Sequence, residues 1–391
     1  MLESIFRLKE NGTSVRTELL AGVTTFLTMA YIIFVQPAVL SGVFIDAPTG
    51  LDYNAVLLAT CVVAALSSMA MGLLARYPIA LAPGMGENFF FVSVVTALSA
   101  AGTQNAWQVA LGVVFIAGVV FFILSLLRVR EAIINAISPS MRNGMATGIG
   151  LFIAFIGLKN GGLIVAEPGT LVGLNPSLVA PDTAVFLVGL LVAGGLQARR
   201  AKGAILWGIA AAAGLALAFG KIQYQGTLGL PDIETPAAFR MDLRAAMSLT
   251  CLPFILVFIF MDMLDTVGTL VGVAEQAGFI KHNRLPRASR ALLVDAGGTV
   301  AGACLGTSTI TSFIESAAGV AVGGRTGLTS CVVGLLFLVS LLFAPIIGMI
   351  GAYAPVTACA LVIVGSMMMR NARKIDWDDY SESIPAFLMA I

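Results

Sequence analysis

The sequence predicts an all-α integral membrane protein built from an inverted repeat of spanning helices. The first observation is composition: of 391 residues, 58% are apolar and only 11% are charged, with a mean hydropathy of +0.97. A soluble domain carries about 25% charged residues, so most of this chain must lie in hydrocarbon. The second observation is a series of long apolar segments. The third is a pair of interrupted segments that recur at a fixed spacing.

Apolar segments of about 18 or more residues predict spanning helices, because about 20 residues cover a hydrocarbon core of roughly 30 Å. The predicted spans lie near 17–40, 54–75, 86–100, 106–127, 143–159, 183–197, 203–220, 247–274, 288–304, 313–323, 327–344 and 354–369. A thirteenth begins at Ile384 and runs to the C-terminus.

Two of these segments, 86–100 and 313–323, are too short to cross a bilayer alone. Each follows a run rich in Gly, Pro, Ser or Thr: Ala80-Leu-Ala-Pro-Gly-Met-Gly-Glu-Asn and Leu305-Gly-Thr-Ser-Thr-Ile-Thr-Ser-Phe-Ile-Glu. Non-helical backbone at membrane depth is tolerated only where it faces protein or a watery cavity. We therefore expect two broken helices with short unwound strands, although the hydroxyls in the second run could simply satisfy one another.

The broken segments also indicate an internal repeat. Glu87 and Glu315 are 228 positions apart (315 − 87), and the starts of the first and eighth spans, Thr17 and Ala245, have the same separation (245 − 17). Seven spans per copy is an odd number, so the second copy must be inverted in the membrane. A complete second copy would run to roughly residue 450. We therefore expect fourteen spans in the full protein, about thirteen of them here, and a truncated C-terminus.

Basic residues predict the orientation of the chain. Placing the N-terminus in the cytoplasm puts 18 of the 22 Lys and Arg residues on that side. The four left outside are Lys159, Lys221, Arg240 and Arg244. Such an asymmetry is typical of cytoplasmic loops. The sequence thus predicts a multi-pass protein of the cell (inner) membrane with a cytoplasmic N-terminus.

Carboxylates inside the predicted spans mark the candidate site. Asp262 and Asp265 lie in Phe258-Ile-Phe-Met-Asp-Met-Leu-Asp-Thr-Val-Gly-Thr-Leu, and Glu315 follows the second unwound run. A charge at mid-bilayer costs at least about 2.5–3.5 kcal/mol unless a ligand, proton or partner satisfies it. Asp262 and Asp265 are three apart and share a helical face, where mutual repulsion favours binding of a proton. Proton coupling is the hypothesis; an acid that only bonds backbone or hydroxyl groups is the alternative.

Polar residues near the starts of the two half helices are further candidates. Glu87, Asn88, Ser312, Glu315 and Ser316 lie where backbone N–H groups have no helical partner and could face a substrate. The alternative is ordinary N-capping, for which these residue types are common.

Two aromatic residues lie beside these polar groups. Phe89 and Phe313 could stack on a flat ring, and filling apolar space is the alternative for each.

Other chemistry is disfavoured. His282, the only histidine, is in a basic loop, and the five cysteines lie singly in apolar segments. We therefore expect no metal site, no cofactor and no enzymatic nucleophile–base pair. Nothing resembles a nucleic-acid footprint.

At these residues the chain resembles the nucleobase–cation symporter-2 family, specifically its azaguanine-type purine permeases. The matching runs are Glu18-Leu-Leu-Ala-Gly-Val-Thr-Thr-Phe-Leu-Thr-Met-Ala-Tyr-Ile, Ala80-Leu-Ala-Pro-Gly-Met-Gly-Glu-Asn, Asp262-Met-Leu-Asp-Thr-Val-Gly-Thr-Leu and Thr311-Ser-Phe-Ile-Glu-Ser-Ala-Ala-Gly. They are spread over essentially the whole chain.

The resemblance implies a uracil-permease-like fold of seven plus seven spans. A core domain would comprise 1–128 and 245–345, and a gate domain would comprise 129–244 and 346–391. It also implies import of hypoxanthine, guanine and adenine with H⁺ as the coupling ion. Carried over by position, the purine-binding residues are Asp265, Glu315 and Asn88, and many relatives have an apolar residue in place of Glu87.

Several alternatives stay open. A transporter of the same fold could carry xanthine or uracil, or an inorganic anion such as sulfate, although Asp265 and Glu315 would repel an anion. Na⁺ could replace H⁺ as the coupling ion. A membrane-embedded enzyme and a channel are weaker alternatives. The expected partners are a small purine base and the lipid bilayer, with a homodimer left open.

Overall fold

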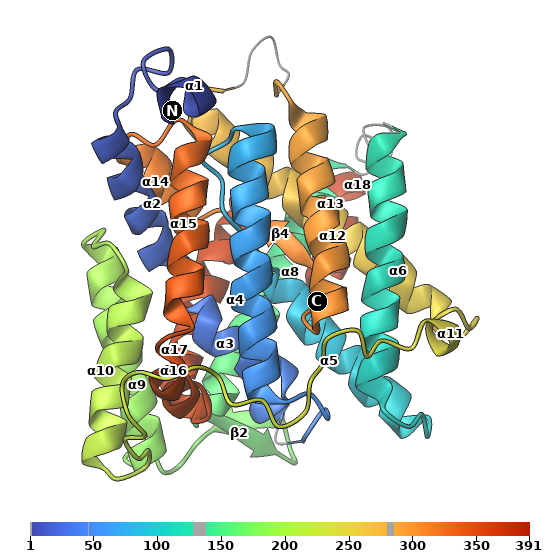
Figure 1. The fold of residues 1–391 in the computed structure, drawn as a ribbon. Helices are drawn as coiled ribbons and strands as arrows, with labels where there is room; N and C mark the ends of the chain where they lie inside the picture. Colours follow the sequence, from blue (N-terminus) through green and yellow to red (C-terminus); the bar gives the residue numbers. More distant parts are fainter. Residues whose placement is uncertain (1, 46, 128–137, 280–284) are drawn as a thin grey trace. The chain divides into compact units, whose positions relative to one another are not determined.

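A computed structural model describes residues 2–45, 47–127, 138–279 and 285–391 (Figure 1). His282, the histidine considered above, lies outside these ranges. The chain divides into two compact units. The first consists of Met1–Arg130 and Gly226–Pro345, and the second of Glu131–Gln225 and Ile346–Ile391. The core and gate roles assigned above stay predictions.

The first unit contains the same order of elements twice, namely helix, helix, strand, helix, helix. The first set is α2 (Val15–Met29) continued by α3 (Ile32–Leu40), α4 (Tyr53–Ala70), β1 (Leu81–Pro83), α5 (Met85–Ala100) and α6 (Ala106–Leu126). The second set is α12 (Leu252–Gln276), α13 (Ala288–Leu305), β4 (Ile310–Ser312), α14 (Ser316–Ala321) and α15 (Gly327–Ser340). This order is the one that the predicted repeat requires.

Short helical turns connect these elements. They are α1 (Leu2–Phe6), η1 (Val43–Ile45), the π-helical turn η2 (Met71–Ala75), α11 (Leu243–Ala246) and α16 (Ala344–Gly351), the last of which crosses the boundary of the first unit. Helix α13 packs between α4 and α6, and the three can be followed side by side in Figure 1.

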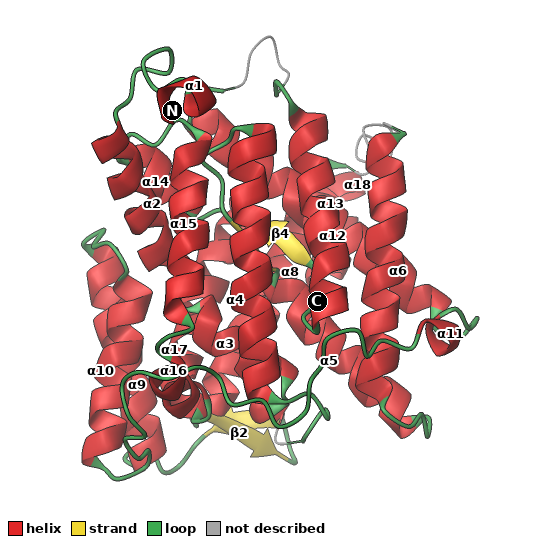
Figure 2. Cartoon of the chain, viewed as in Figure 1, coloured by secondary structure: helices red, strands yellow, loops and turns green. Residues whose placement is uncertain are grey.

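The two unwound strands pair with one another inside the first unit. Strands β1 and β4 are antiparallel, with Ala82 opposite Thr311, and Figure 2 shows β4 among the surrounding helices. Antiparallel pairing of equivalent strands is what an inverted repeat produces. The separation of paired residues falls from 231 for Leu81 and Ser312 to 227 for Pro83 and Ile310 (312 − 81 and 310 − 83), a range that includes the predicted 228. The predicted broken helices and unwound strands are confirmed.

Side chains from neighbouring helices satisfy the backbone around β1. The Ser68 hydroxyl of α4 donates to Leu81 O at 3.0 Å and accepts from Leu81 N at 2.9 Å. The Ser330 hydroxyl of α15 lies 2.7 Å from Tyr77 O and 2.9 Å from Ile79 O. Strand backbone at membrane depth is tolerable only when its polar groups find such partners.

In the described part of the second unit, all the regular elements except one hairpin are helical. Its elements are α8 (Pro139–Asn160), β2 (Ile164–Glu167), β3 (Leu171–Leu174), α9 (Pro181–Ala198), α10 (Ala204–Ala218), α17 (Ala354–Met368), η3 (Met369–Lys374) and α18 (Tyr380–Ala390). Small residues let these helices approach closely: a methyl group on Gly189 of α9 would lie 2.9 Å from the Cβ of Ala212 on α10.

Seven helical segments of the described chain are long and apolar enough to cross a membrane. Helices α5, α10 and α15 are apolar but shorter. Several predicted boundaries differ from the structure by a few residues, and two of them lie beside the candidate site. The segment predicted at 247–274 begins as a helix at Leu252, because Pro253 favours the first helical turn. The second half helix begins at Ser316, so Ser312 belongs to β4 and Phe313 to the link between strand and helix.

Candidate functional site

The structure brings most of the predicted site residues together around the β1–β4 pair of the first unit. Helix α5 contributes Glu87 and Asn88 from its first turn, and α12 contributes Asp262 and Asp265. Glu315 lies directly before α14. Asp265 is partly exposed and the other four are buried.

Glu315 is held at its side chain and at its backbone by the bend between α2 and α3. The Tyr31 hydroxyl donates to Glu315 Oε1 at 2.9 Å, and both side chains are buried. The Thr28 hydroxyl lies 3.4 Å from the Glu315 carbonyl oxygen, a long contact. Because Tyr31 engages one carboxylate oxygen, the orientation of the Glu315 side chain is fixed.

Asp265 connects the two half helices electrostatically. Its carboxylate is close enough to those of Glu87 and Glu315 to interact with both, and the Thr311 hydroxyl of β4 contacts it. Three carboxylates in one apolar region repel one another strongly because the surrounding dielectric constant is low. The group therefore needs protons or ligand donors to be stable.

Asp262, predicted to share proton coupling, is placed differently. Its Oδ2 lies 3.2 Å from the Thr299 hydroxyl of α13, which also accepts from Ile310 N of β4 at 3.0 Å. Asp262 is only 2% exposed. This geometry favours the alternative in which Asp262 supports the strand, while its role in proton coupling stays a prediction.

Asp295 of α13 is a buried acid that the sequence analysis missed. It accepts from the Thr266 hydroxyl at 2.7 Å and from the Ser312 hydroxyl at 3.4 Å, and it interacts electrostatically with Glu87. The signal was present, because an acid inside the predicted span 288–304 carries the same cost as Asp265. Ser312 is thus engaged with Asp295 from within β4.

Glu87 folds back over the start of its own helix. One carboxylate oxygen, Oε2, lies against Gly84, the residue that precedes α5. The other, Oε1, is buried and has no hydrogen-bond partner among the described residues. A carboxylate at a helix N-terminus is stabilised by the unpaired N–H groups there. Capping therefore accounts for the position of Oε2 but not for that of Oε1.

Asn88 is joined to the unwound stretch before β4. The Ser308 hydroxyl donates to Asn88 Oδ1. The Gln36 amide nitrogen of α3 donates in turn to the Ser308 hydroxyl oxygen at 3.1 Å and to the Thr307 hydroxyl oxygen at 2.9 Å. Gln36 and Ser308 were not predicted as site residues.

The two candidate aromatic residues are both buried. Phe89 faces Phe44 with ring centroids 6.4 Å apart, which fits a role in apolar packing. Phe313 is 5% exposed, and its backbone N–H donates to Ala80 O at 2.9 Å. This bond places Phe313 at the end of the strand pair, beside Glu315.

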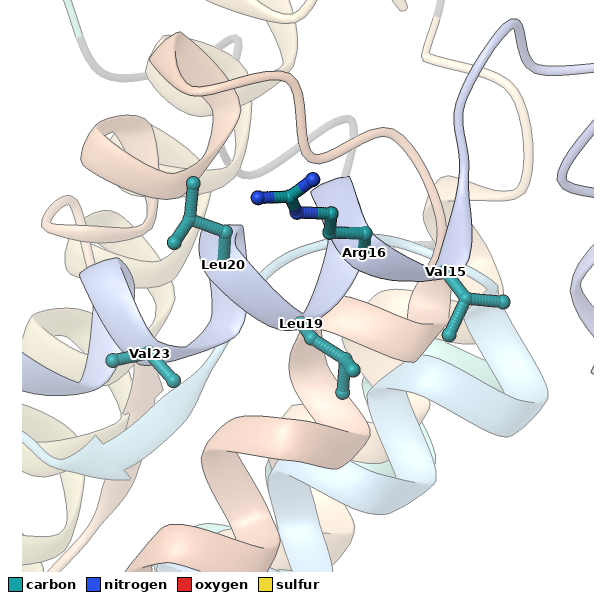
Figure 3. A pocket seen from close by; sticks show the side chains of 5 residues that line it. All are labelled: Val15, Arg16, Leu19, Leu20 and Val23. Carbon is teal, nitrogen blue, oxygen red and sulfur yellow. The ribbon is translucent and has the colours of Figure 1, made fainter.

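A shallow hollow on the outer face of α2 contains none of these acids (Figure 3). It is lined by Val15, Arg16, Leu19, Leu20 and Val23. The four aliphatic side chains are between 38% and 54% exposed. An exposed aliphatic face with an arginine at the end of a spanning helix is typical of contact with lipid.

Comparison with known proteins gives the family. An adenine permease of Escherichia coli is 41% identical over 391 residues, which cover all of this chain and 85% of that protein. A guanine/hypoxanthine permease of Bacillus subtilis is 42% identical over 395 residues, covering 99% and 88%. The transmembrane domain of a cyanobacterial bicarbonate transporter has the same fold, with a TM-score of 0.71 at 16% identity over 96% of this chain and 94% of that domain. The model of the Permease family matches residues 16–391, and the chain belongs to this family of multi-pass membrane transporters.

Proposed function

We propose that this protein is a secondary active transporter that imports the purine nucleobases hypoxanthine, guanine and adenine together with protons. The proposal rests on the gathering of Asp265, Glu87 and Glu315 beside Asn88 at the meeting point of two broken helices. Relatives named for adenine and for guanine/hypoxanthine support the substrate class.

The chemistry of the site suits a purine edge. Such an edge presents N–H donors next to ring acceptors, and a carboxylate can accept from those donors. Glu315 would accept from the base, since Tyr31 engages Oε1. Leaving a buried polar group unpaired costs about 1–3 kcal/mol, so a ligand without the matching donors would bind poorly. Phe313 would lie against the flat face of the ring.

Proton coupling follows from the same acids. When the site is empty, mutual repulsion favours one proton on Asp265 or Glu315. The proton would relieve this repulsion, and the protonated carboxyl group would donate to a ring acceptor while a second carboxylate accepts from the base. Base and proton would therefore bind together and be released inward together. Downhill proton entry would then drive accumulation of the base.

Uptake of labelled hypoxanthine tests the proposal. Cells that lack purine uptake and express the protein should accumulate label more strongly at acidic external pH, and an uncoupler should abolish this. Asp265→Asn and Glu315→Gln should each remove accumulation. Glu234→Gln, an exposed acid outside the site, is the matched control. Accumulation that persists in both site variants would defeat the assignment.

Competition separates the alternative substrates and ions. Unlabelled guanine and adenine should compete with hypoxanthine. Displacement by sulfate would favour an anion transporter, and displacement by xanthine or uracil would change the substrate. A requirement for Na⁺ at constant pH would replace H⁺ as the coupling ion. The bicarbonate transporter is only 16% identical to this chain, so its similarity supports the fold and not the substrate.

We also propose the domain roles and the orientation. The core that binds substrate would comprise 1–128 and 245–345, and the gate 129–244 and 346–391. The first compact unit also includes 226–244, which this proposal gives to the gate. The N-terminus would lie in the cytoplasm of a cell whose inner membrane holds the protein. A fluorescent protein fused before Met1 should be quenched only by reagents that enter the cytoplasm.

A further inference from the structure

A chain of three buried side chains joins the first span to the first half helix. Gln36 of α3, Ser308 before β4 and Asn88 of α5 are each fully buried. Gln36 Nε2 donates to Ser308 Oγ at 3.1 Å, and Ser308 Oγ donates to Asn88 Oδ1. These hydrogen bonds therefore run from the first copy of the repeat (Gln36) to the second (Ser308) and back to the first (Asn88).

The direction of this hydrogen-bonded chain is determined by Gln36. An amide nitrogen can only donate, so the Ser308 oxygen must accept from it. Ser308 has one hydroxyl hydrogen, which is then available for Asn88 Oδ1. The Asn88 amide is thereby fixed with its oxygen toward Ser308 and its nitrogen turned away. Within the described chain, that nitrogen contacts only Met85 Sδ at 4.0 Å, a weak acceptor.

We propose that Gln36 and Ser308 are positioning residues that make Asn88 a hydrogen-bond donor to the ligand. This inference rests on the proposed function and deepens it. Carboxylates at the site would accept from N–H groups of the base, while the Asn88 amide nitrogen would donate to an acceptor on the same ring. The site would select purines that carry a donor and an acceptor together, and would discriminate against rings lacking that acceptor.

Analogues of hypoxanthine that each lack one acceptor reveal the contact. The 3-deaza and 7-deaza compounds each lack a ring nitrogen that accepts a hydrogen bond, and unsubstituted purine lacks the oxygen at position 6. We expect at least one of them to inhibit labelled hypoxanthine uptake about tenfold more weakly than hypoxanthine does, the value of one good hydrogen bond. If none does so, the proposal is overturned.

Two variants test the direction of the chain. Ser308→Ala removes the connection to Asn88, and Gln36→Glu replaces the donor by an acceptor at nearly constant volume. In each variant the tenfold penalty should shrink to about twofold or less, because the Asn88 amide is free to reverse. A penalty that stays unchanged in both variants would overturn the inference. If Ser308→Ala fails to reach the membrane, Gln36→Glu carries the test alone.

Matched controls separate positioning from general damage. Ser308→Thr keeps the hydroxyl and should keep the penalty. Thr307→Val removes the other acceptor of the Gln36 nitrogen, 2.9 Å away, without touching the link to Asn88. It should also keep the penalty. Loss of the penalty in both controls counts against the proposal. Lack of purine competition in the unmodified protein would instead defeat the proposed function itself.

Discussion

The two broken helices of the first unit have equivalent strands but unequal helices. Strand β1 is followed almost at once by the sixteen residues of α5, whereas a three-residue link separates β4 from the six residues of α14. Glu87 therefore lies inside a first helical turn, and Glu315 lies ahead of one. The two acids come from corresponding places in the repeat but have different surroundings.

We infer from this difference that Glu87 has mainly a structural role and that Glu315 binds the substrate. One carboxylate oxygen of Glu87 lies against Gly84, at the N-terminus of its own helix. Glu315 is instead oriented by Tyr31, a residue from the bend of another span. Both carboxylates also interact with the backbone of their own residue, so the Tyr31 hydroxyl is the contact that distinguishes Glu315 from Glu87. We therefore expect substrate recognition to depend on Glu315 more strongly than on Glu87.

The largest expected effect comes from exchanging the two acids for amides. Glu315→Gln should lower hypoxanthine uptake by about 100-fold or more, since it removes acceptors from a charged, buried contact. Glu87→Gln should lower it by about fivefold or less, because an amide oxygen can still cap the helix. Initial uptake rates normalised to the amount of protein in the membrane measure both. Equal losses would show that the two sites are functionally equivalent after all.

A smaller effect is expected when only the support of Glu315 is removed. Tyr31→Phe deletes the hydroxyl that donates to Glu315 Oε1 and keeps the ring. The KM for hypoxanthine should rise about tenfold while protein abundance stays the same, and the dependence of uptake on external pH should shift because Glu315 has lost a donor. Tyr31→Leu, which also removes the ring, distinguishes loss of packing. An unchanged KM and pH profile in Tyr31→Phe would assign Tyr31 to packing alone.

The smallest effect on uptake is expected from substitutions that disturb the packing of each half helix. These substitutions should act mainly on the stability of the protein. A methyl group on Gly319 of α14 would lie 2.7 Å from the Ala21 carbonyl oxygen of α2, which is rigid backbone. On Gly84 it would meet mainly the movable Glu87 carboxylate. Gly319→Ala should destabilise the protein by about 1–3 kcal/mol, and Gly84→Ala by less. The stability of the two variants can be ranked by heating each in detergent and measuring how much monodisperse protein remains at each temperature. The reverse ranking would mean that α14 can move away from α2.

The sequence predicted those parts of the site that polarity alone can mark. Asp265, Glu315, Asn88 and the two unwound stretches were found because polar groups at membrane depth are costly. Asp295 was overlooked, although the same cost applies to it. The sequence predicts helix for the link before α14, because no local signal distinguishes a capping glutamate from one inside the first turn.

Other features depend on contacts that no local pattern contains. The hydrogen bonds from Gln36 to Ser308 and from Ser308 to Asn88 join residues more than two hundred positions apart. Asp262 and Asp265 look alike in sequence, yet the first accepts a hydrogen bond from Thr299 and the second interacts electrostatically with two other carboxylates. The hairpin of β2 and β3 was missed because its residues lie in the connection between two predicted spans, outside the apolar segments on which the prediction was based.

The pairing of β1 with β4 has a consequence for biosynthesis. Pro83 leaves the ribosome 227 residues before Ile310, its partner in the strand pair (310 − 83). Until then, among the described residues already made, the Ser68 hydroxyl is the side-chain partner of the first strand's backbone. The early segment must therefore wait in a hydrated or chaperoned state, and cross-linking of stalled nascent chains should find it beside the insertion machinery until the later strand emerges.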